Sequence, residues 1–143
     1  MTLERCFDER KLRKDRPDLL KAERSVVVAE SKLKRAEELS DAGFQDAALL
    51  TAYAAMFHAG RALLFKDGII EKSHYCLSAY LKETYGKSGK IKQEVLTIMD
   101  AFREERHDAL YSLEGITVQQ DGAKTAIENA KMLLEAVKRI LSD

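Results

Sequence analysis

Apolar residues recur along much of the chain at alternating intervals of three and four positions, the spacing that places them on one face of a helix. The clearest run lies between residues 18 and 42, and Gly43 follows it as a helix stop. This pattern predicts an amphipathic helix over residues 18–42, whose buried stripe is Leu19, Ala22, Val26, Ala29, Leu33 and Ala36.

The next segment, residues 44–65, is apolar on nearly every side. Between Ala47 and Phe65 the only polar side-chain groups belong to Thr51, Tyr53, His58 and Arg61. A helix that is apolar all round is a buried one, so this segment is predicted to be the central helix. Its alanines and Gly60 leave room for neighbouring helices to approach closely.

Three further helices are predicted downstream: a short one from an N-cap at Ser73 to about Tyr85, one over residues 90–111, and one from a capping box at residues 117–120 to about Leu141. The expected fold is therefore all-α, an up-and-down antiparallel bundle of four to five helices. Residues 1–15 are highly charged and lack the stripe, which predicts a short appended helix or a loose arm before a bundle domain at 16–143.

Composition restricts the partners and the compartment. The 143 residues suffice for one domain, and the 24 basic and 24 acidic residues cancel, so contact with nucleic acid requires a local basic patch. Because no uninterrupted apolar run reaches the roughly 18 residues of a membrane span, no membrane partner is expected. The charged start lacks a signal-peptide core, which predicts a cytoplasmic protein.

No metal site or cofactor is predicted. Cys6 and Cys76 are far apart and belong to no CxxC motif, so two free thiols are expected and neither a disulfide framework nor a zinc site. The Gly86-Lys87-Ser88 sequence is not a phosphate-binding loop, because Leu81 occupies the position of that motif's first glycine.

Polar residues on the central helix need partners. Arg61, three residues after His58, requires a receptor for its buried charge. One interpretation is an internal salt bridge with a core histidine, and the other is a polar pocket or a dimer seam. His74 either joins such a pocket or caps its own helix.

The densest polar signal runs from Arg103 to Tyr111. Arg103, His107 and Tyr111 are four residues apart and share one helix face, with Arg106 on its flank. Guanidinium groups suit phosphate, and histidine can move protons near neutral pH. The alternative is a solvated charged face.

Two segments resemble the prokaryotic HEPN domain, in its small stand-alone subgroup. The first is Thr51-Ala52-Tyr53-Ala54-Ala55-Met56-Phe57-His58-Ala59-Gly60-Arg61-Ala62-Leu63-Leu64-Phe65, followed by Gly68 and Lys72-Ser73-His74. The second is Arg106-His107-Asp108-Ala109-Leu110-Tyr111, which falls where the family carries an arginine with a histidine four to six residues beyond it.

The resemblance implies a helical bundle, a homodimer, and a minimal nucleotidyltransferase partner encoded nearby in a toxin–antitoxin-like pair. Family members with the full motif resemble metal-independent ribonucleases in which the arginine holds the phosphate and the histidine assists the 2′-hydroxyl. Here Tyr111 replaces that histidine, and a tyrosine with a pKa near 10 is a poor base at neutral pH.

Three functions follow from these observations. The first is a module that binds nucleotide or RNA phosphate and pairs with the nucleotidyltransferase. The alternatives are a ribonuclease toxin and a non-catalytic helical adaptor. The candidate phosphate-binding residues are Tyr53, His58, Arg61, His74, Arg103 and Arg106, and the candidate catalytic residues are Arg106, His107 and Tyr111.

Overall fold

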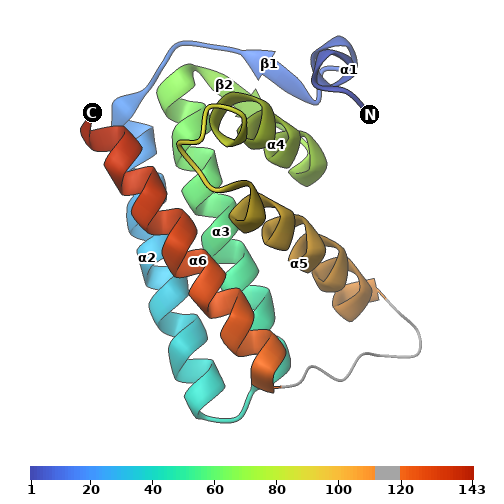
Figure 1. Ribbon diagram of the computed structural model, residues 1–143, viewed down its shortest axis with the longest axis vertical. Helices are drawn as coiled ribbons and strands as arrows, with labels where there is room; N and C mark the ends of the chain where they lie inside the picture. Colours follow the sequence, from blue (N-terminus) through green and yellow to red (C-terminus); the bar gives the residue numbers. More distant parts are fainter. Residues whose placement is uncertain (112–119) are drawn as a thin grey trace.

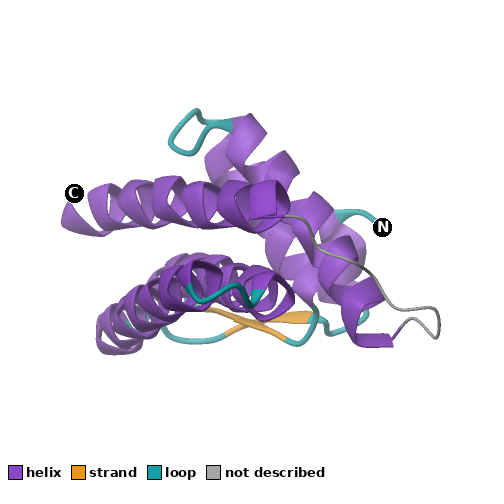
Figure 2. Ribbon diagram, turned by 90° about the horizontal axis from the view of Figure 1, so that it is seen from below, coloured by secondary structure: helices purple, strands orange, loops and turns teal. Residues whose placement is uncertain are grey.

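The computed structural model describes residues 1–111 and 120–143, which form an almost entirely helical protein (Figures 1 and 2). Its long helices are α2 (Leu19–Asp41), α3 (Gln45–Asp67), α5 (Gln93–Tyr111) and α6 (Gln120–Ser142), and the shorter elements are α1 (Leu3–Asp8), β1 (Leu12–Lys14), β2 (Ile69–Glu71), α4 (His74–Leu81) and the π-helical turn η1 (Lys82–Gly86). Figure 1 shows the chain descending in α2, rising in α3, descending in α5 and rising in α6. The all-α up-and-down bundle is confirmed.

Helices α2 and α3 form an antiparallel pair because α2 presents small residues to its neighbour. Ala22, Ala29 and Ala36 are fully buried at intervals of seven, and side chains this small let two helix backbones pack closely. The predicted stripe is wrong at one position: Leu19 is exposed, since it is the first residue of α2 and lies beyond the covered part of the helix.

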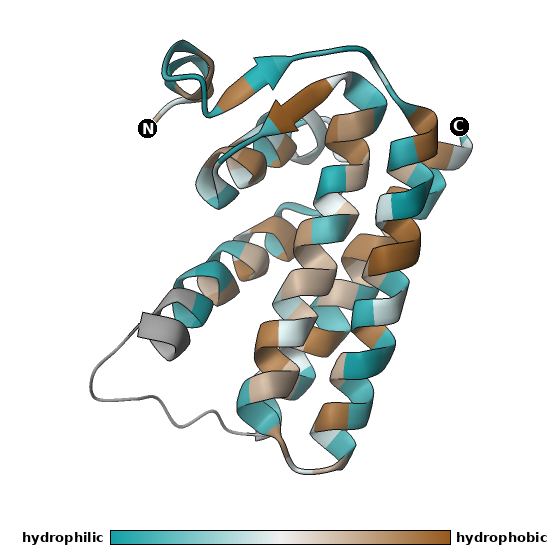
Figure 3. Ribbon diagram, turned by 180° about the vertical axis from the view of Figure 1, so that it is seen from behind, coloured by the Kyte–Doolittle hydropathy of each residue, from teal (hydrophilic) through white to brown (hydrophobic). Residues whose placement is uncertain are grey.

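Helix α3 is the central element, as predicted, and packs against α2, α4, α5 and α6. A methyl group added at Gly60 would lie 2.8 Å from a Leu81 side-chain carbon, so the predicted close approach is confirmed. By length and composition α3 could cross a membrane. This finding corrects the expectation from the sequence that no segment is long and apolar enough to do so. Most of that stretch is buried against other helices, as expected of a core helix; Figure 3 shows its apolar colouring.

A short strand pair, which the sequence pattern did not predict, ties the N-terminal residues to the end of α3. Strands β1 and β2 are antiparallel, with Leu12 opposite Glu71 and Lys14 opposite Ile69. Within residues 1–15 the chain forms α1 and β1, the helical alternative of the two proposed for this segment, and both Cys6 and Leu12 are buried.

Cys6 and Cys76 form a disulfide that joins α1 to α4, so the expectation of two free thiols is wrong. A separation of 70 residues carries no information about proximity until the fold is known. The β1–β2 pairing brings the N-terminal segment beside the start of α4, and the two cysteines meet there.

Some predicted helix boundaries shift. The third helix ends at Leu81 instead of Tyr85 and continues as η1, in which the Lys87 N–H donates to the Lys82 carbonyl. The fourth begins at Gln93, after a connecting segment in which the Ile91 N–H donates to the Tyr85 carbonyl. The predicted capping box at residues 117–120 lies outside the described side chains.

Gly68 is a position where another residue should be costly. It ends α3 with a left-handed φ of +74°, and a Cβ there would lie 2.5 Å from the Asp15 carbonyl oxygen. We expect Gly68→Ala to lower the free energy of unfolding by about 2 to 3 kcal/mol, because backbone strain and a steric clash add. Urea denaturation measures the change.

Gly43→Ala is the matched control. Gly43 also has a positive φ, +89°, but an added Cβ meets nothing within 4 Å. In this variant the free energy of unfolding should fall by only about 1 kcal/mol, the contribution of backbone strain. If both variants lose the same free energy of unfolding, the clash between the added methyl group and the Asp15 carbonyl oxygen contributes nothing.

Candidate functional site

The polar residues of α3 and α4 meet through one hydrogen bond. Tyr53 is almost fully buried in the middle of α3, and its hydroxyl oxygen lies 2.9 Å from His74 Nδ1 at the start of α4. Their rings are stacked with centroids 5.7 Å apart. Ser73 caps α4 by accepting from the Cys76 N–H, so His74 is free to face Tyr53. The pocket interpretation of His74 is the one that its contacts favour.

Phe57 extends this contact along α3. It is four residues after Tyr53, and its ring stacks on His74 with centroids 4.2 Å apart. On its other side it meets His58 edge-on at 5.5 Å, and the Arg61 guanidinium carbon lies 5.9 Å from its centroid. Phe57 therefore links His58 and Arg61 to the Tyr53–His74 pair.

Two arginines from α5 reach the same place. The Arg106 guanidinium carbon lies 5.7 Å from the Tyr53 ring centroid, and that of Arg103 lies 5.3 Å from the Tyr75 centroid. These are cation–π distances. Their three-residue spacing puts both on the side of α5 that meets α3 and α4. Among the described residues, Arg106 makes no ion pair.

Asp100 positions Arg103. Arg103 Nε lies 3.5 Å from Asp100 Oδ1, which also accepts from the Ser78 hydroxyl at 2.6 Å, and Lys82 pairs with the other carboxylate oxygen. Burial alone would raise the pKa of Asp100, but the hydrogen bonds from Lys82 and Ser78 and the charges of Lys82 and Arg103 outweigh it and lower that pKa. Asp100 is therefore a carboxylate at neutral pH.

The electrostatics show that these groups share one environment. Burial lowers the pKa of His74, and the charges of Arg106 and Arg103 lower it further, so His74 is neutral at pH 7. Burial raises the pKa of Tyr53 to about 12 although Arg106 and Arg103 act in the opposite direction. Tyr53 is therefore a protonated phenol and a hydrogen-bonding group, not a base.

His58 lies beside this group without a described hydrogen bond. Burial lowers its pKa, and the charges of Arg61 and Lys32 add to that effect, so His58 is neutral at pH 7.

Arg61 has a structural partner. Its Nε lies 3.0 Å from Oε1 of Glu71 in β2, whose side chain is only 6% exposed. The pair is close in distance, but the Nε–H is not aligned for a hydrogen bond, and Glu71 Oε2 has no partner among the described residues. The guanidinium also lies 5.3 Å from the Phe65 centroid. The internal salt bridge is therefore the interpretation that the structure supports for Arg61.

The arginine–aromatic cluster is the name used below for the residues that converge from α3, α4 and α5: Tyr53, Phe57, His74, Tyr75, Arg103 and Arg106. Among the contacts of the described residues, the sequence-predicted residues His58 and Arg61 reach the cluster through Phe57. His107 and Tyr111 belong to α5, but their side chains lie outside the described residues.

Phe57, Tyr75 and Asp100 are functional candidates that the sequence reasoning missed. Each had a spacing signal: Phe57 is midway between Tyr53 and Arg61, Tyr75 follows His74, and Asp100 precedes Arg103 by one helical turn. In the part of the chain that the structure describes, no group of three or more His, Cys, Asp or Glu residues could hold a metal ion.

The cluster has the chemistry of an anion site with a stacking surface. Guanidinium groups donate paired hydrogen bonds to phosphate oxygens, and aromatic rings can stack on a base. The family model described as HEPN domain matches residues 22–140, which include every member of the cluster. No curated protein matches the chain.

Proposed function

Because the chain belongs to the HEPN domain family, which is commonly related to nucleotides and RNA, we propose that the arginine–aromatic cluster binds the phosphate group of a nucleotide or of RNA. The observation that carries this proposal is the convergence of Arg103 and Arg106 on the Tyr53–His74 pair. A chain with no net charge gains phosphate affinity only where cations gather locally.

Binding without cleavage is the activity that the cluster supports best. A ribonuclease of this kind needs a base for the 2′-hydroxyl, and Tyr53, with a pKa of about 12, cannot serve at neutral pH. The neutral His74 already uses its Nδ1 in the hydrogen bond with the Tyr53 hydroxyl. The family's catalytic histidine is replaced by Tyr111. Two guanidinium groups can position a phosphate without any catalytic base.

Replacing Arg106 tests the proposal. We expect Arg106→Ala to weaken binding of a short single-stranded RNA about tenfold, because a charge-assisted hydrogen bond and a cation are lost. Isothermal calorimetry at fixed salt measures the change. Arg35→Ala is the control. Arg35 is exposed on α2, so this substitution removes the same charge at a position outside the cluster. Equal weakening in both variants would contradict the proposal.

A cleavage assay separates the two activities. Total RNA incubated with the wild-type protein in EDTA should stay intact while the calorimetric binding persists. Cleavage that disappears in Arg106→Ala would instead establish the metal-independent ribonuclease and would place Arg106 in its active site.

RNA affinity should also depend on pH through His74. A bound phosphodiester offsets the arginine charges, so it raises the lowered pKa of His74, and protonated His74 then attracts the phosphate. Affinity should therefore rise as the pH falls from 7 to 5, by up to about tenfold for each unit by which binding raises that pKa. This gain in RNA affinity disappears when the pH exceeds the pKa of His74 in the complex.

His74→Asn is the variant that isolates this effect. It removes the titrating group and keeps a polar side chain of similar length beside Tyr53. Its RNA affinity should change with pH less than that of the wild type. The same pH profile in both proteins would assign the dependence to another group.

The protein partners are a further part of this proposal: a second copy of the chain and a minimal nucleotidyltransferase in a toxin–antitoxin-like pair. Large exposed hydrophobic residues along α2, Leu20 and Val27 among them, support a self-association surface. We also propose that the protein is cytoplasmic. Analytical ultracentrifugation of the protein, alone and with the proposed nucleotidyltransferase, tests both partners. A monomer at micromolar concentration contradicts the homodimer.

A further inference from the structure

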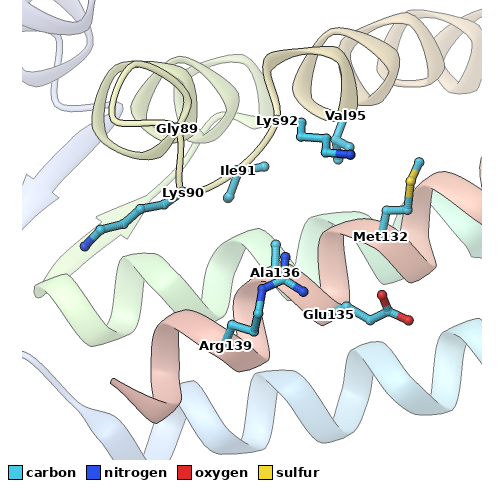
Figure 4. Close-up of a pocket in the computed structure, with 9 residues that line it drawn as sticks. All are labelled: Gly89, Lys90, Ile91, Lys92, Val95, Met132, Glu135, Ala136 and Arg139. Carbon is cyan, nitrogen blue, oxygen red and sulfur yellow. The ribbon is translucent and has the colours of Figure 1, made fainter.

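A cavity of about 330 Å³ lies between the segment that leads into α5 and the second half of α6 (Figure 4). It is separate from the arginine–aromatic cluster. Lys92, on its wall, precedes Arg106 by 14 residues of a mostly helical stretch, which corresponds to about 20 Å along the axis. The cavity therefore needs its own explanation.

Three cations line the cavity, and none of them pairs with an acidic residue that the structure describes. Lys90, Lys92 and Arg139 line it, and among the described residues none of the three makes an ion pair. Two other basic residues of α6 are paired: Lys131 lies 3.6 Å from a carboxylate oxygen of Glu37, and Lys138 lies 2.8 Å from one of Glu30. Arg139 therefore differs from its neighbour Lys138, whose charge is already offset by α2.

The inner surface of the cavity is apolar. Ile91 and Val95 are buried on one side and Ala136 is buried on α6, while Met132 is 45% exposed at the edge. In Figure 4 the side chains of Arg139 and Met132 rise from α6 toward the segment that carries Ile91 and Val95. A ligand that fits must combine an apolar part with an anionic group.

Charge and size narrow the ligand class. Of the described residues that line the cavity, Glu135 alone carries a carboxylate, so three cations leave a surplus of two positive charges. This surplus matches the charge of about −1.5 to −2 of a phosphate monoester at neutral pH. The volume is at the small end of the range of about 300 to 1,000 Å³ for ligand pockets. A phosphodiester, with a single charge, leaves the surplus uncompensated.

We propose that this cavity binds a nucleoside carrying a phosphate monoester, with the phosphate on Arg139 and Lys92 and the base against Ile91 and Met132. Free nucleoside monophosphates and the 5′-phosphate end of an RNA share this chemistry. The site is independent of the arginine–aromatic cluster, so either can fail without the other.

The methyl group of Met132 is a direct reporter, because the chain has only four methionines. Adenosine 5′-monophosphate added to protein with ¹³C-labelled methionine methyls should shift the Met132 signal, and adenosine or inorganic phosphate should bind at least tenfold more weakly. Arg139→Gln should weaken binding at least tenfold. Lys138→Gln, which removes the same charge one residue away, should leave the affinity unchanged.

Three results would overturn the proposal: no shift of the Met132 signal, equal weakening by Arg139→Gln and Lys138→Gln, or inorganic phosphate that binds as tightly as the nucleotide. A short RNA with a 5′-phosphate distinguishes the two sources, with the same RNA bearing a 5′-hydroxyl as its control. A Met132 shift that requires the 5′-phosphate supports the proposal with RNA ends as a source, and a shift with the mononucleotide alone supports it with free nucleotides.

Discussion

Replacing Cys6 with alanine is expected to lower the free energy of unfolding by about 3 to 4 kcal/mol under oxidising conditions, because a cross-link across 70 residues restricts the unfolded chain. The effect should be large because the disulfide fastens α1 to α4 beside the cluster. The Tyr75 hydroxyl, next to Cys76, donates to the Met1 carbonyl oxygen at 3.0 Å. Urea denaturation with and without a thiol reductant measures the contribution.

The reductant supplies the control. Reduced wild type and reduced Cys6→Ala should differ only by the packing of one buried side chain, about 1 kcal/mol. A difference that stays the same with and without reductant would show that the cross-link contributes nothing. In the cytoplasm that we propose for this protein, thiols are kept reduced, so the reduced value is the one that applies there.

Arg61→Leu is expected to lower the free energy of unfolding by about 3 kcal/mol, because it leaves the buried carboxylate of Glu71 without its cation. One oxygen of that carboxylate already has no described partner. The loss of contacts with Phe57 and Phe65 adds to the effect. Thermal and urea denaturation both report it.

The double variant Arg61→Leu with Glu71→Leu distinguishes charge from packing. Replacing both members of a buried ion pair with apolar residues is often close to neutral, so most of the stability should return. If the double variant is as unstable as the sum of the two single variants, the ion pair is not the reason for the loss. Neither variant removes a residue of the arginine–aromatic cluster.

The helices could be predicted from the sequence because their periodicity is a local property. The alanines of α2 and the all-round apolar character of α3 define a buried stripe and a central helix without knowledge of the rest of the chain. The boundaries of α4 and α5 could not be predicted as well, since η1 continues α4 directly and packs against α5, a contact that local sequence does not reveal. Three-residue strands carry too few alternating positions to be recognised.

The site could be predicted only as a set of residue types. Arg103 and Arg106 stood out by their spacing and charge, and Tyr53 and His74 by their place in the family's pattern, but their meeting depends on how α3, α4 and α5 pack. Arg61 shows the converse: its partner Glu71 is ten residues away, in a strand that periodicity did not reveal. The Cys6–Cys76 disulfide could not be predicted either, because the same strand pairing brings the two cysteines together.

The measurement that tests the central claim most directly is an NMR titration of the histidine side chains with a short RNA. The chain has three histidines, so substitution assigns each signal. The account predicts that RNA shifts the His74 signals and raises the pKa of His74 in the wild type, and that Arg106→Ala greatly reduces both changes. RNA that binds without altering the His74 signals or their pKa would contradict it.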